Sequence, residues 1–109
     1  MTTVPSVTPA VELVDKEREY GRSCQFALNE MMTAGRVALA PGKMTTPASH
    51  DNEEECLYVL AGSGSVLLGG AWKQAAAGDF IYIPRHVTHA VRNDGADELV
   101  YLYFGTFQP

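Results

Sequence analysis

The chain has 109 residues, which is the usual size of one domain and leaves no room for a second. Its 13 acidic and 8 basic residues give a formal net charge of −5, and it lacks the clustered Lys and Arg side chains that phosphate-backbone binding needs. No apolar run approaches the roughly 18 residues of a membrane span. We therefore expect neither a nucleic-acid partner nor a membrane partner.

The amino terminus contains Thr and Pro but no basic residue, so it lacks the charged and apolar blocks of a secretory signal. We predict a flexible tail over residues 1–10 and one domain over residues 11–109. Cys24 and Cys56 are too few for a disulfide scaffold, and free thiols acting as small apolar residues are the favoured interpretation. These features indicate a cytoplasmic protein.

The first half of the domain contains two predicted strands. Apolar and polar residues alternate over Ser23–Leu28, which is the period of a half-buried strand. We expect a turn over Asn29–Gly35 and a second strand that begins at Arg36 and reaches Ala40.

The second half alternates short strands with turns. Strands are expected at Leu57–Ala61, Ser65–Leu68, Asp79–Ile83, Val87–Arg92 and Leu99–Phe107. Gly62–Gly64 and Asn93–Gly95 read as turns, and Gly69–Gly70 reads as a tight hairpin. The last strand is apolar on both faces, so one side should pack on the core and the other on a partner. Many short strands without a convincing helix favour an all-β barrel or sandwich.

Three side chains are candidate metal ligands: His50, Glu55 and His89. If residues 48–50 form a strand, Ala48 and His50 point the same way, and a hairpin return brings Glu55 beside them. His89 lies between valines in a predicted strand, where a metal or a hydrogen bond would satisfy a buried imidazole. If that strand lines the same cavity, the three residues form a 2-His-1-carboxylate set with up to three open positions, which suits non-haem Fe(II).

Two spaced motifs resemble those of the cupin family. In the cupin pattern, the first motif has a glycine, two histidines, a glutamate and a glycine, and the second has a glycine, a proline, a glycine, a histidine and an asparagine. The matching positions here are Gly42, Ala48, His50, Glu55 and Gly62, then Gly78, Pro84, His86, His89 and Asn93. Ala48 replaces the first histidine, and His86 replaces the middle glycine of the second motif.

The resemblance spans Gly42 to Asn93 and implies an all-β, single-domain cupin, a double-stranded β-helix or jelly-roll barrel. It implies one divalent metal ion, Fe, Mn, Ni or Zn, held by His50, Glu55 and His89. Ala48 would then mark a vacant ligand position open to substrate, and small cupins of this type are expected to be homodimers. Cupin activities are so varied that the family defines the fold better than the reaction.

Simpler interpretations remain for several of these residues. His50 could be an exposed loop residue, and Glu55 could belong to a solvated acidic run, although the motif spacing favours ligation for both. His86 is more simply a rim residue than a substrate contact or proton shuttle. Asp51 or Glu53 could supply an oxygen in place of the lost imidazole, although Asp51 should face away from His50 in a regular strand.

The leading functional hypothesis is a mononuclear metalloenzyme acting on a small organic acid, sugar acid or polyketide-like carbonyl compound, with dioxygenase, isomerase or cyclase chemistry. The alternative is a metal-free or non-catalytic small-molecule-binding cupin, because fewer ligands lower the metal affinity. A purely structural dimerisation domain gives no reason for polar groups to converge. The sequence assigns no catalytic residue; the possible acids by residue type, which could equally be packing residues, are Tyr58, Tyr82, Tyr101 and Tyr103.

Overall fold

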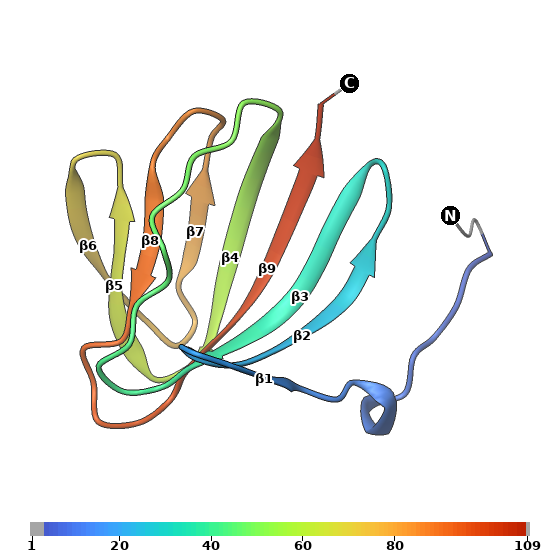
Figure 1. The fold of residues 1–109 in the computed structure, drawn as a ribbon, viewed down its shortest axis with the longest axis horizontal. Helices are drawn as coiled ribbons and strands as arrows, with labels where there is room; N and C mark the ends of the chain where they lie inside the picture. Colours follow the sequence, from blue (N-terminus) through green and yellow to red (C-terminus); the bar gives the residue numbers. More distant parts are fainter. Residues whose placement is uncertain (1–3, 109) are drawn as a thin grey trace.

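The computed structural model describes residues 4–108, which form nine strands and one short 3-10 helix (Figure 1). The elements are, in chain order, η1 (Ala10–Glu12), β1 (Lys16–Arg18), β2 (Gly21–Leu28), β3 (Met32–Leu39), β4 (Glu53–Ala61), β5 (Ser63–Leu68), β6 (Ala71–Ala76), β7 (Phe80–Ile83), β8 (His89–Arg92) and β9 (Leu99–Phe107). No helix among these residues is both long and apolar enough to cross a membrane.

The strands form two antiparallel sheets. The large sheet has the order β1-β2-β3-β9-β4-β7, and the small sheet has the order β6-β5-β8. Buried side chains from both sheets make one core, in which Leu39, Ile83 and Leu99 are the largest fully buried apolar residues. The prediction of an all-β jelly-roll barrel is confirmed.

Strand register separates the large sheet into an inner and an outer face. Leu57 pairs with Tyr103 and Ile81 on the inner face, toward the small sheet and the core. The alternate residue Cys56 pairs with Phe104 and Tyr82 on the outer face. Because side chains alternate along a strand, β4 sends Glu55 inward and Tyr58 outward.

Three predicted boundaries are wrong. The turn after β2 is confined to 29–31, because the side-chain oxygen of Asn29 accepts hydrogen bonds from the backbone N–H groups of Met31 and Met32 at 2.8 and 3.0 Å and closes it early. β4 begins at Glu53, four residues before the predicted start, and pairs there with Phe107. Only Gly62 separates β4 from β5, which lie in different sheets, so this connection is a crossover between sheets rather than a hairpin turn.

Other boundaries agree more closely. β9 has the predicted bounds, and β5 and β6 form the predicted hairpin around Gly69, whose φ of 66° is in the left-handed region. The connection between β8 and β9 is held by Asn93, which is buried. Its side-chain nitrogen donates hydrogen bonds to the carbonyl oxygens of Leu39 and Asp97, and its side-chain oxygen accepts one from the N–H of Gly95.

The segment 40–52, which joins β3 to β4, is not the regular strand predicted around Ala48 and His50. It runs irregularly beside β8 (Figure 1), to which backbone hydrogen bonds attach it. The N–H of Thr45 donates to Val91 O, and Ala48 and His89 exchange two bonds, at 3.0 and 2.8 Å. His50 therefore reaches the site from a loop.

The N-terminal segment lies outside the barrel (Figure 1). Residues 4–9 are exposed and have no regular structure, and four exposed valines follow one another along the arm: Val4, Val7, Val11 and Val14. Residues 1–3 of the predicted tail lie outside the described residues, and the division at residue 10 stays a prediction. Asp15 connects the arm to the sheet through Arg36, 3.0 Å away, and through Arg22.

Candidate metal centre

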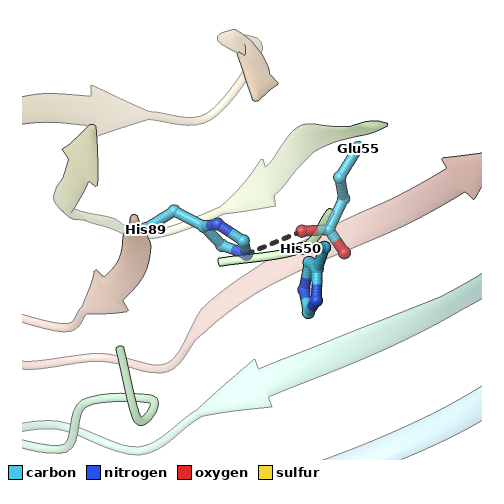
Figure 2. Close-up of side chains that lie close together, drawn as sticks. All are labelled: His50, Glu55 and His89. Carbon is cyan, nitrogen blue, oxygen red and sulfur yellow. Dashed lines mark ion pairs between the residues drawn. The ribbon is translucent and has the colours of Figure 1, made fainter. Parts of the chain in front are cut away.

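The structure brings His50, Glu55 and His89 together from three elements: the 40–52 loop, β4 and β8 (Figure 2). One possible ligand atom from each lies within 4.8 Å of the other two. The two imidazole rings are 5.2 Å apart between centroids and tilted by 57°. The convergence expected from the motif spacing is thus present in the geometry, although the loop, not a strand, delivers His50.

His89 is held in a defined orientation. Its Nδ1 is 3.0 Å from the carbonyl oxygen of Val87, so Nδ1–H donates to that oxygen and Nε2 is directed at Glu55. Nε2 lies 3.1 Å from Glu55 Oε1. The hydrogen bond to Glu55 raises the pKa of His89, and the Val87 carbonyl adds to this effect, while burial opposes it. A backbone carbonyl that accepts from Nδ1–H is a usual way to orient a metal-binding histidine.

The three side chains fit a divalent ion. Ligand atoms about 2.0–2.2 Å from one ion lie roughly 3 Å apart when they are adjacent, which matches the 3.1 Å between His89 and Glu55. The imidazole of His50 is partly exposed, so its ring can turn toward the same point. Two imidazoles and one carboxylate suit Fe, Mn, Ni or Zn better than Mg or Ca.

Glu53 is a fourth polar group at this site. Its Oε1 is 3.8 Å from His50 Nε2, and only 11% of its side chain is exposed. A Cβ at Gly105 would lie 2.1 Å from Glu53 Oε2, so glycine at this position makes room for the carboxylate. Burial raises the pKa of Glu53, and the charge of Glu55 adds to the shift.

Of the two acidic residues considered as replacements for the missing imidazole, only Glu53 lies near the three candidate ligands. Asp51 is 96% exposed and pairs with His86, at 3.4 Å between Oδ1 and Nδ1.

His86 and Ala48 lie at the edge of the site. His86 has a φ of 71°, in the region that favours glycine, and its ring is 67% exposed and turned toward Asp51. Its backbone N–H donates to the carbonyl oxygen of His50 at 2.8 Å, which helps to place the His50 loop. Ala48 acts through its backbone, which pairs with His89. A substrate contact by either residue stays a prediction.

A cavity of about 240 Å³ opens beside Glu55 and His89. Its walls combine apolar and hydroxyl-bearing side chains: Val37, Thr45, Thr46, Leu57, Val91, Tyr101 and Tyr103, with Glu55 and His89. Burial raises the pKa of both tyrosines, so their phenols stay protonated near neutral pH. Tyr58 and Tyr82, the other two possible acids, lie on the outer face and are exposed.

Comparison with known proteins settles the family. The family model described as "Cupin domain" matches residues 35–105, which include all three candidate ligands. The chain belongs to the cupin domain family. The resemblance inferred from the two motifs is confirmed, and it extends to β3 and β9 on either side of them.

Individual cupin relatives are distant. The chain is 28% identical over 78 residues to mannose-1-phosphate guanylyltransferase ManC of Salmonella typhimurium, a match that covers 72% of this chain but only 16% of that protein. A structure of a putative sugar phosphate isomerase from Acidithiobacillus ferrooxidans is 28% identical, with a TM-score of 0.72, and the match covers 92% of this chain and 74% of that one. A predicted oxalate decarboxylase from Thermotoga maritima shares the fold, with a TM-score of 0.86 at 21% identity and coverage of 94% and 99%.

Sequence reasoning about this cupin missed part of the cavity wall. Thr45 and Thr46 line the cavity and lie in the first motif, between Gly42 and Ala48. Threonine is common in loops, so the sequence did not indicate that these two residues face a cavity. Glu53 was considered as a replacement oxygen, but its position beside Glu55 was not predicted, although residues two apart on a strand share a face. That inference required a strand that begins at Glu53, whereas the run of three glutamates favours a solvated loop.

Proposed function

We propose that this cupin holds one divalent metal ion through His50, Glu55 and His89 and acts as a mononuclear metalloenzyme on a small organic acid or sugar-derived carbonyl compound. The observation that carries the proposal is the orientation of His89, whose Nδ1 is engaged by Val87 O and whose Nε2 faces Glu55 at 3.1 Å beside a cavity. A bound divalent ion supplies Lewis-acid polarisation of a carbonyl or carboxylate oxygen.

The other wall residues would bind and orient the substrate. The hydroxyls of Thr45, Thr46 and Tyr103 can donate hydrogen bonds to substrate oxygens, and the raised pKa of Tyr103 keeps its proton available for that role. Val37 and Leu57 exclude water from one side of the cavity. Among dioxygenase, isomerase and cyclase reactions we favour isomerisation, because one 28%-identical relative is a putative sugar phosphate isomerase.

The decisive experiment is elemental analysis of untagged protein purified without chelators and under low oxygen. We expect close to one Fe, Mn, Ni or Zn per chain, and little metal in His50→Ala. His86→Ala is the matched control, because it removes an exposed histidine outside the ligand set and should keep the metal. Protein without metal after reconstitution with each ion would refute a metalloenzyme.

The second candidate is a metal-free binding protein. It is favoured by the contact between His89 and Glu55, because a protonated imidazole paired with a carboxylate satisfies both groups without an ion. His89→Ala distinguishes the candidates. A metalloenzyme should lose both metal and turnover, whereas a metal-free binder should retain its affinity for ligand.

We further propose that the protein is a homodimer that associates through the outer face of the large sheet. Four exposed aromatic side chains lie on the outer surface of β4, β7 and β9: Tyr58, Phe80, Tyr82 and Phe104. Exposed apolar surface of this kind is usually covered by a partner. A second copy of this chain presents the same aromatic face, which a two-fold axis would bring together.

A cytoplasmic location remains part of the proposal. Cys24 and Cys56 are unpaired, as is usual for thiols in a reducing compartment. Cell fractionation with an antibody to the protein would test it, and recovery outside the cytoplasmic fraction would contradict it.

A further inference from the structure

Glu53 is a largely buried carboxylate without a hydrogen bond. Only 11% of its side chain is exposed, and within residues 4–108 its two carboxylate oxygens accept no hydrogen bond. The one basic group within 4.0 Å of it among these residues is His50, whose Nε2 lies 3.8 Å from Glu53 Oε1. A carboxylate that is removed from water without a partner is costly, so this side chain requires a cation or a proton.

Strand register explains how the Glu53 carboxylate comes level with Glu55. Glu53 pairs with Phe107 of β9, whereas Glu55 pairs with Gly105. A Cβ at Gly105 would overlap Glu53 Oε2 and lie 3.1 Å from Glu53 Cδ, so the Glu53 side chain leans along the sheet and covers Gly105. Its carboxylate therefore lies at the register position that faces Glu55, and only glycine at position 105 leaves this place open.

The two carboxylates give the site the charge that a divalent ion needs. In the described part of the chain, no lysine or arginine nitrogen lies within 4.0 Å of Glu53 or Glu55, and their ion-pair partners are His50 and His89. Imidazoles bind a metal ion in the neutral form, so the two histidines add no charge to such a centre. Two carboxylates then balance one divalent ion, whereas Glu55 alone would leave a net positive charge.

The distance between Glu53 and His50 suits two ligands of one ion. Ligand atoms on opposite sides of an ion lie about 4 Å apart when each is about 2.0–2.2 Å from it, and the observed separation is 3.8 Å. Small rotations of the two side chains are enough to direct both at the same point. Asp51, the other acidic candidate, is 96% exposed and pairs with His86 instead.

We propose that Glu53 is a fourth metal ligand, a carboxylate from the inner face of β4 that replaces the imidazole absent at Ala48. This assignment rests on the proposed metal-dependent function and completes its ligand set. A second carboxylate shifts the preference of the site toward Mn, because oxygen ligands suit harder ions. Four protein ligands on a six-coordinate ion leave two positions, enough for one chelating substrate but not for a substrate and O₂ together. The ligand set therefore favours isomerase over dioxygenase chemistry.

Two measurements on Glu53→Gln test the assignment: the Mn²⁺ affinity by titration calorimetry, and the visible absorption spectrum of the Co²⁺-loaded protein, which reports the donors bound to the ion. The affinity should fall by about a hundredfold, the upper end of what the loss of an outer-shell partner costs. The Co²⁺ bands should shift in position and intensity. Glu54→Gln is the matched control, because it changes the same charge on the outer face of β4, and it should keep the affinity and the spectrum of the wild type.

Gly105→Ala provides a second test that changes no charge. The added methyl group takes the place of the Glu53 carboxylate, so this variant should also weaken Mn²⁺ binding and shift the Co²⁺ bands. Thermal unfolding verifies that each variant is folded at the temperature of the titrations.

An unchanged Mn²⁺ affinity or an unchanged Co²⁺ spectrum in Glu53→Gln would overturn the fourth ligand. The proposed function would survive that result, provided that the wild type binds one ion and His89→Ala binds none. Wild-type protein that binds no ion after reconstitution would overturn the proposed function and the fourth ligand together.

Discussion

The inner and outer faces of the large sheet are built from the same strands but have opposite properties. On β4 and β7, Glu55 and Ile83 pair on the inner face, while the next residues, Cys56 and Tyr82, pair on the outer face. The inner face is packed and closes around a polar site. The outer face leaves aromatic rings in contact with solvent, including Phe80, which is 65% exposed.

This difference shows how a small barrel can place a polar site on one face of a sheet and an exposed aromatic surface on the other face, without a second domain. A shift of one residue in the register of β4 would exchange the faces and move Glu55 out of the cavity. The core that holds the register is therefore as necessary to the site as the ligands themselves. The two faces should respond very differently to substitution.

The largest effect is expected from Ile83→Ala on the inner face. Ile83 is 1% exposed and pairs with Glu55, so truncation leaves a cavity and should lower the free energy of unfolding by about 2–5 kcal/mol. Urea denaturation measures this loss. Leu28→Ala, at an exposed position, is the control and should cost less than about 1 kcal/mol. Equal losses at the two positions would contradict the assigned core.

On the outer face, Phe80→Glu should disrupt the proposed dimer. Burying an unpaired carboxylate between two aromatic faces costs about 2–5 kcal/mol of association free energy, enough to give a monomer at micromolar concentration. Light scattering of the eluted protein measures the mass, and metal content should not change. Lys73→Glu, on the small sheet, should leave the dimer intact. A wild-type monomer would show that the aromatic face has another role.

Metal binding should weaken as the pH falls. The contact with Glu55 raises the pKa of His89 above its usual 6.5 in the metal-free protein, so below that raised pKa an entering ion must displace a proton. The apparent Mn²⁺ affinity should fall by about tenfold per pH unit there and level off above it, within the range of about pH 5 to pH 8 where histidine titrates. Titration calorimetry measures both the affinity and the protons released.

The stability that the His89–Glu55 pair contributes to the metal-free protein should increase as the pH falls, whereas the metal affinity decreases. A raised pKa means that the His89–Glu55 pair contributes its full stability below pH 6.5 and loses it as the pH rises through the raised value. His86→Gln, which removes an exposed histidine, should leave both profiles unchanged. Metal affinity that is constant with pH would show that His89 is not a ligand.

The smallest effect is expected at His86. Its φ of 71° is costly for a side chain with a Cβ, so His86→Gly should raise the free energy of unfolding by about 0.5–1 kcal/mol. The hydrogen bond from its backbone to His50 O is retained. Thermal unfolding measures the gain, with His86→Ala as the control that keeps the strain. A loss of metal in His86→Gly would indicate that the ring supports the site.

The fold was predictable because its strands alternate and its turns carry distinct residues. Leu99–Phe107 was located correctly, because its aliphatic and aromatic residues strongly favour a strand in spite of Gly105. The start of β4 was not located correctly, because three consecutive glutamates are typical of a solvated loop. Pairing of Glu53 with Phe107 and of Glu54 with Thr106 overrides that local preference.

The convergence of His50, Glu55 and His89 was predictable from the motif spacing, but the path of the chain to it was not. The assumption of a strand at Ala48 was wrong, because that segment is positioned by backbone hydrogen bonds to β8.

The backbone bonds between Ala48 and His89 have a mechanical consequence. They make the loop of His50 and the strand of His89 part of one layer, the small sheet, while Glu55 belongs to the large one. An ion bound by all three would cross-link the two layers of the barrel, much as a disulfide joins distant chain segments. Metal binding should therefore restrict the relative motion of the two sheets and slow hydrogen exchange at the backbone amides of Ala48 and His89.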